Sequence, residues 1–201
     1  MDLKQWTIDA FAAQVFEGNP AAIVPLADWL DDRLMQAIAL ENNLSETAFF
    51  VETAPGRYGL RWFTPQMEVD LCGHATLASA YVVFSHVAPG LNTVTFDTHS
   101  GPLTVTRAAG GLLEMDFPAI AARKPEGAAE IGRRLAAVMG CPEPEEVYAA
   151  PDLMAVFADA RAVRALSPQA GLGPLLNELG MRGLIAAAPS DDPAFDFVSR
   201  F

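Results

Sequence analysis

The chain has 201 residues, of which 51% are hydrophobic and 19% are charged, and its mean hydropathy is +0.21. This composition argues against an intrinsically disordered chain, and the length allows one large domain or two small ones. A formal net charge of -12, with only 13 Lys and Arg, argues against a nucleic-acid partner, because proteins that bind the phosphate backbone concentrate basic side chains on one face.

The N-terminus, MDLKQWTIDAF, alternates in the manner of a strand and has no basic segment followed by an apolar one, so no secretory signal is predicted. The longest apolar run, residues 71–84, has 14 residues, fewer than the roughly 20 that a helix needs to span a bilayer. Two cysteines, Cys72 and Cys141, are too few for a disulfide framework. We therefore expect a cytoplasmic protein without a membrane partner.

Short strand patterns between turn residues dominate the first half of the chain. They occur at residues 6–11, 21–26, 48–52, 58–64, 93–97 and 103–107. A further strand pattern at residues 112–117 follows Gly110 and Gly111. Paired glycines between two strands predict a β-hairpin with the glycines at its tip.

One amphipathic helix is predicted between the second and third of these strands, over residues 28–43. Leu30, Leu34 and Ile38 recur at intervals of four residues and would form its apolar face. Aspartates at its start suit the positive end of the helix dipole, and two asparagines mark its end.

The composition changes after Phe117 to PAIAARKPEGAAE, which is rich in Pro and Ala and follows neither the strand nor the helix period. We therefore predict two domains, residues 1–118 and residues 119–201. Downstream, the pattern predicts a helix, two strands, one or two more helices, and two final strands. Their ranges are 128–139, 146–150, 153–159, a helical region that ends at 179, 183–189 and 195–201. The expected fold class is α+β.

The stretch NNLSETAFF places one acid, Glu46, at the start of an apolar run. With strand alternation from Ser45 onward, Glu46 shares a face with Ala48 and Phe50. Desolvation raises the pKa of a carboxylic acid, and a general acid/base that works near neutral pH requires such a raised pKa. The alternative is a solvated glutamate in a helix-to-strand turn, and the pattern alone leaves both interpretations open.

The stretch DLCGHATLASA predicts a helix that begins at Gly73. The free backbone N–H groups of Gly73, His74 and Ala75 would form a helix N-terminus that can bind a substrate carboxylate. Gly73 would let a ligand approach the backbone closely, and His74 could hold or relay a proton. The alternative is a buried helix start with an internally hydrogen-bonded histidine.

Cys72 and His74 have no second Cys/His pair at ligand spacing, so no metal site is predicted. A Cys–His nucleophilic pair is not favoured either, because two residues this close together at a helix start need not face each other. Cys72 is therefore assigned to the core or to the lining of a pocket. The chain has no phosphate-binding loop or dinucleotide fingerprint, so no nucleotide cofactor is predicted.

Five blocks of sequence, in order, are similar to those of the PhzF-like phenazine biosynthesis isomerases, which belong to the diaminopimelate epimerase fold group. The blocks are IDAFAAQVFEGNPAAIV, NNLSETAFF, RWFTPQMEVDLCGHATLASA, THSGPLTV and DFVSRF. Each block alone is a weak signal, but together they span nearly the whole chain. The resemblance implies two similar domains, each with a curved sheet around a central helix, and an active site in the cleft between them.

The resemblance also implies roles for individual residues. Glu46 would act as general acid/base and move a proton between two carbons of a small carboxylate-bearing metabolite. Gly73 and His74 would form part of the pocket for the substrate carboxylate. Further residues expected to line that pocket are Ser45, Asn19 and Cys72. Neither a metal nor an organic cofactor is expected, and a homodimer is expected.

The family pattern continues beyond DFVSRF into a segment of the type Asp-Pro-x-Thr-Gly-Ser, which this sequence does not contain. We therefore expect a chain that is truncated at its C-terminal end relative to the family, with an incomplete second domain that lacks its central helix and an opposing catalytic acid. A non-catalytic binding or scaffold protein of the same fold is one alternative.

A Cys-dependent amino-acid epimerase is a second alternative, because epimerases of this fold group carry a catalytic cysteine at the place of Cys72. The isomerase that uses Glu46 is preferred. Cys141 has no sequence context that matches the partner cysteine of a two-base racemase.

Overall fold

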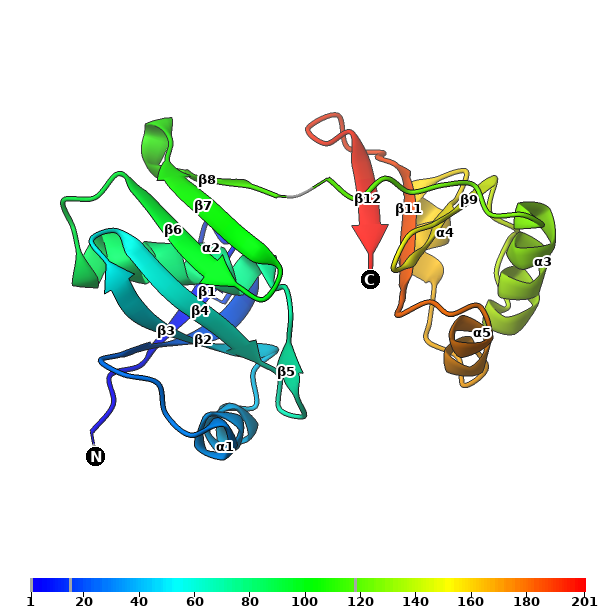
Figure 1. Cartoon of the computed structure of the whole chain (residues 1–201). Helices are drawn as coiled ribbons and strands as arrows, with labels where there is room; N and C mark the ends of the chain where they lie inside the picture. The colour runs from blue at the N-terminus through cyan, green and yellow to red at the C-terminus, as the bar shows by residue number, and fades with distance from the viewer. Residues whose placement is uncertain (1, 15, 118) are drawn as a thin grey trace. The chain divides into compact units, whose positions relative to one another are not determined.

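A computed structural model describes residues 2–14, 16–117 and 119–201. The chain divides into two compact units, residues 1–118 and residues 119–201 (Figure 1). Both units combine helices with a mostly antiparallel sheet, so the predicted α+β class is confirmed. Every helix within the described residues is too short or too polar to cross a bilayer.

The first unit is built on one eight-stranded sheet that curves around a helix (Figure 1). The strands lie in the order β1 (Trp6–Ala10), β2 (Asn19–Leu26), β3 (Glu46–Ala54), β4 (Arg57–Phe63), β6 (Thr93–Thr98), β7 (Gly101–Arg107) and β8 (Leu113–Asp116), and β5 (Glu68–Val69) pairs with β4. The pairs β2–β3 and β4–β6 are parallel. Parallel neighbours need a crossover, and helices α1 (Asp32–Asn42) and α2 (Gly73–Val82) lie within these two connections.

The two crossover helices cover opposite faces of the sheet. Ala48 and Phe50 of β3 belong to the core cluster around α2, whereas Phe49 belongs to the cluster beneath α1. Alternate residues of a strand point to opposite faces, so β3 is buried on both sides. This explains the nearly continuous apolar run that follows Glu46.

The hairpin predicted around Gly110 and Gly111 is confirmed. Strands β7 and β8 pair antiparallel from Arg107 opposite Leu113. Both glycines have positive φ angles, 74° and 81°, in the region that side chains disfavour. The glycines therefore allow this tight connection.

The apolar face predicted for α1 is confirmed at Ile38, which packs against the core cluster beneath the helix, and is wrong at Leu34. The helix begins after Asp31, whose carboxylate caps it by accepting a hydrogen bond from a backbone N–H, so Leu30 lies outside the helix. Leu34 is 40% exposed, whereas Met35 and Ala39 are 0% and 1% exposed. Each residue turns the helix by about 100°, so Met35 takes the place predicted for Leu34 in the buried stripe, together with Ile38 and Ala39.

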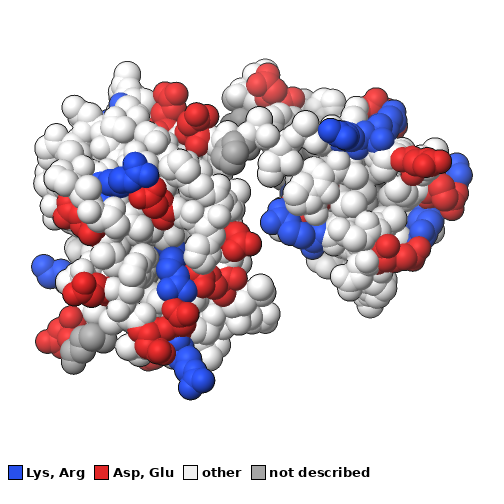
Figure 2. Space-filling view, viewed as in Figure 1, with Lys and Arg blue, Asp and Glu red and all other residues white. Residues whose placement is uncertain are grey.

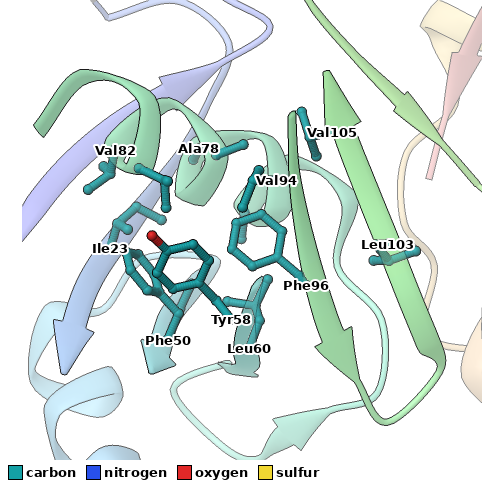
Figure 3. Packing of buried hydrophobic residues seen from close by; sticks show 14 of the residues in the cluster. Ile23, Phe50, Tyr58, Leu60, Ala78, Val82, Val94, Phe96, Leu103 and Val105 are labelled. Carbon is teal, nitrogen blue, oxygen red and sulfur yellow. The ribbon is translucent and has the colours of Figure 1, made fainter. Parts of the chain in front are cut away.

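The core of the first unit lies between α2 and the concave face of the sheet (Figure 3). Phe50, Tyr58 and Phe96 pack against one another with ring centroids 5.3 to 6.3 Å apart. On the helix, Ala75 and Ala78 are buried, and small side chains allow a helix to lie close to a sheet. This packing fixes the position of α2, and with it the residues at its N-terminus.

The second unit has a four-stranded sheet and its own core. The strands lie in the order β12 (Phe197–Arg200), β11 (Leu184–Pro189), β10 (Leu153–Val156) and β9 (Glu146–Ala149), and the helices are α3 (Ala128–Met139), α4 (Ala160–Ala165) and α5 (Leu172–Glu178). The helix predicted over residues 128–139 is confirmed as α3. Leu135 of α3, Leu153 of β10 and Leu175 of α5 are buried together in this core.

Acidic and basic side chains are interspersed on the face of the molecule seen in Figure 2. Exposed ion pairs such as Arg57–Asp97 in the first unit and Arg164–Asp191 in the second join opposite charges. Exposed pairs of this kind contribute little to stability, typically about 0–1 kcal/mol. The net charge of -12 reflects an excess of acidic residues, 25 Asp and Glu against 13 Lys and Arg.

Candidate active site

The residues singled out from the sequence lie at one end of the first sheet. Asn19 begins β2 and Glu46 begins β3, and the two strands pair in parallel with Ala21 opposite Glu46. Neighbouring parallel strands start at the same end of the sheet, so both residues lie at that end. The hydroxyl of Ser45 donates a hydrogen bond to Oδ1 of Asn19 over 2.9 Å. The structure thus brings Asn19 and Ser45 together beside Glu46.

The first turn of α2 brings a second group of residues to Glu46. Oε2 of Glu46 lies 3.1 Å from Nε2 of His74, and Nδ1 of His74 lies 3.4 Å from Sγ of Cys72. The side chains of Glu46 and His74 are only 17% and 10% exposed. Cys72 and His74 therefore do contact each other, although their spacing did not favour a pair.

Two polar atoms of this cluster have no hydrogen-bond partner. The 3.1 Å separation between Oε2 of Glu46 and Nε2 of His74 is short, but its geometry is not that of a hydrogen bond, and both atoms are buried without a partner among the described residues. Nearly all buried polar atoms in proteins are hydrogen-bonded, and an unpaired one costs about 1–3 kcal/mol. These two atoms are therefore available to a ligand.

The thiol of Cys72 is held in its neutral form. Burial, together with the negative charge of Glu46, raises the pKa of the Cys72 thiol to about 12, although the backbone N–H groups of Ala75 and His74 act in the opposite direction. A thiol with this pKa is protonated near neutral pH, and the thiolate is the reactive form of cysteine. This environment argues against a Cys-dependent epimerase.

The rates at which the two cysteines are alkylated test this description of the surroundings of Cys72. At pH 8 we expect iodoacetamide to modify Cys141 well before Cys72, because Cys72 is 7% exposed and a pKa of about 12 leaves roughly one thiolate in ten thousand. Peptide mass spectrometry over a time course measures both rates. In a Glu46→Gln variant, Cys72 should react faster, because a negative charge beside it is removed. Equal rates at the two cysteines of the unchanged protein would contradict this prediction.

Gly73 leaves space for an aromatic ring. A Cβ atom at Gly73 would lie 2.7 Å from Cζ of Phe117 and 3.8 Å from Cε of Met115. The missing side chain thus lets the end of β8 approach the first turn of α2. Phe117 was not identified as a site residue from the sequence, because only the close approach to Gly73 shows where its ring lies.

The structure of a PhzF-family phenazine biosynthesis protein from Enterococcus faecalis is 41% identical and superimposes with a TM-score of 0.84, covering 100% of this chain and 73% of that chain. A hydroxyproline epimerase from Agrobacterium vitis is 9% identical with a TM-score of 0.57, covering 98% of this chain and 69% of that chain. The second likeness concerns the fold alone. The fold is therefore of the epimerase-like class that the sequence predicts.

Sequence comparison identifies the family. The family model of PhzC-PhzF, phenazine biosynthesis-like proteins, matches residues 8–201. An uncharacterized isomerase of Pseudomonas aeruginosa is 47% identical over 201 residues, covering 100% of this chain and 73% of that protein. A phenazine biosynthesis-like domain-containing protein of Homo sapiens is 48% identical over 125 residues, covering 59% of this chain and 43% of that protein. The chain belongs to the PhzC-PhzF family, and isomerase is the class of activity that its relatives support.

Proposed function

We propose that the protein is an isomerase that moves a proton on a small carboxylate-bearing metabolite, with Glu46 as the general acid/base. The observation that best supports this proposal is the buried carboxylate of Glu46, whose oxygen Oε2 has no hydrogen-bond partner in the described part of the chain and lies beside a helix N-terminus. An unpartnered carboxylate inside a protein is poised to accept a proton from a bound substrate.

The substrate carboxylate binds at the first turn of α2. The N–H groups of Gly73 and His74 begin a helix of ten residues, and the positive end of the helix dipole favours an anion there. Glu46 then removes a proton from an acidified C–H of the substrate and returns it to a different carbon. Such a reaction needs an acid/base group and a water-poor site but no organic cofactor.

His74 is positioned for this reaction by Cys72. Because the Cys72 thiol stays protonated, it can donate to Nδ1 of His74, 3.4 Å away. Nδ1 is then an acceptor, and the imidazole proton lies on Nε2, which faces Glu46. In this tautomer Nε2–H can donate a hydrogen bond to the substrate. Cys72 thus acts through His74 as a positioning residue.

Solvent hydrogen exchange tests the proposal. The protein, treated with a chelator, is incubated in D₂O with a panel of unsaturated and hydroxylated carboxylic acids, and deuterium uptake is followed by mass spectrometry. At least one acid should gain deuterium or isomerise without added cofactor, and its amide analogue should not. An acid that binds tightly without exchange would instead favour a non-catalytic binding protein of the same fold. Turnover only after a cofactor is added would contradict the proposal.

A further inference from the structure

The cluster of Glu46, Cys72 and His74 has the composition of a metal site. One carboxylate oxygen, one sulfur and one imidazole nitrogen lie within 4.8 Å of one another. Zinc takes all three of these ligand types, and three protein ligands with an open fourth position are typical of non-structural zinc sites. We propose that this cluster binds one zinc ion, and that the bound ion blocks the carboxylate of Glu46. This inference goes beyond the proposed isomerase and does not depend on its substrate.

The distances suit a tetrahedral ion after a small adjustment. Two donor atoms that lie at zinc-bonding distance from one ion are separated by roughly 3.3–3.8 Å. The separation between Sγ of Cys72 and Nδ1 of His74, 3.4 Å, already lies in this range. The ligand atoms of the cluster all lie within 4.8 Å of one another, and Oε2 of Glu46 lies 3.1 Å from Nε2 of His74, so the carboxylate must turn toward Nδ1 to close the site. A change in the side-chain torsions of Glu46 supplies this movement.

Charge in the cluster favours a cation. Among the described residues, His74 is the only basic side chain within ion-pair distance of Glu46, and Oε2 of Glu46 has no hydrogen-bond partner. A divalent cation supplies the missing positive charge. The positive end of α2 opposes the cation in part, but it also favours the thiolate that the cation requires.

Binding releases one proton. The S–H bond of Cys72 breaks, the sulfur forms a bond to zinc with the electron pair of that bond, and the proton passes to solvent. No electron is transferred, because zinc has no redox chemistry here. The thiolate and the carboxylate together balance the two charges of the ion, and His74 binds as neutral imidazole. The buried site is then electrically neutral.

Cobalt titration tests the proposal without an activity assay. Co²⁺ replaces Zn²⁺ at tetrahedral sites and reports a thiolate ligand through a charge-transfer band in the near ultraviolet. Adding Co²⁺ to the chelator-treated chain should give this band with one equivalent bound, and Zn²⁺ should remove it. Cys72→Ser should abolish the band, whereas Cys141→Ser, the matched control at the other free cysteine, should keep it.

Two further variants complete the test. Glu46→Gln and His74→Gln should keep the band but weaken Co²⁺ binding at least tenfold, and circular dichroism checks that each variant is folded. If the band does not form, or if it depends on Cys141 and not on Cys72, the proposal is overturned. Equal Co²⁺ affinity in all four variants would also overturn it. Failure of the isomerase assay leaves these readouts unchanged, so the two proposals fail separately.

Discussion

Replacing Glu46 with Gln is expected to lower the rate of proton transfer by about 10²–10⁴-fold, the usual contribution of a general acid/base. Glutamine keeps the size of the side chain and one of its oxygens, but it cannot accept and return a proton. The loss should appear in kcat, because the substitution leaves the proposed carboxylate site at the first turn of α2 unchanged. Substrate affinity should change much less.

The measurement is deuterium uptake under single-substrate conditions, with kcat and KM determined separately. Glu52→Gln is the matched control, because Glu52 lies on the same strand but is exposed. This control should retain the rate of the unchanged protein. If the Glu46→Gln variant keeps at least a third of the original kcat, Glu46 is not the general acid/base.

Replacing Phe96 with Ala is expected to destabilise the first unit by about 3–5 kcal/mol, the range for removing a buried phenylalanine. Phe96 is 0% exposed and contacts the rings of Phe50 and Tyr58 (Figure 3). The substitution leaves a cavity between α2 and the sheet and also removes favourable aromatic contacts. A domain with a typical total stability of about 5–15 kcal/mol would lose a large part of it.

Urea denaturation followed by tryptophan fluorescence measures this effect. The three tryptophans, Trp6, Trp29 and Trp62, all lie in the first unit, so the signal reports the unfolding of that unit alone. Phe11→Ala is the control, because Phe11 belongs to the same unit and is 74% exposed. Its effect should stay within about 0.5 kcal/mol. Equal shifts of the urea midpoint in the two variants would show that Phe96 contributes no more to the stability of the first unit than the exposed Phe11 does.

Much of the fold follows from local patterns in the sequence. Strand alternation and paired glycines locate β7 and β8, and helical periodicity locates α3. Strand β5 was missed because its two residues are too few to show a period. Within the buried face of α1, Leu34 was predicted in place of Met35, because both are apolar and only contact with the sheet decides which of them is buried.

The candidate site was only partly predictable. Alternation in β3 correctly places Glu46 on the face of Ala48 and Phe50. Its contact with His74 depends on the crossover between β4 and β6, which contains α2, and no local spacing encodes that contact. Ligand spacing along the chain cannot reveal the Glu46, Cys72 and His74 cluster for the same reason.

The residues proposed for the reaction stand at the ends of secondary-structure elements, and the residues that stabilise the fold stand in their middles. Asn19 and Glu46 begin strands and His74 lies in the first turn of a helix, whereas Phe50 and Phe96 lie inside strands. Changes at the ends alter which groups meet a ligand without opening a cavity in the core. Such a scaffold can acquire a different reaction in evolution through few substitutions while its architecture persists.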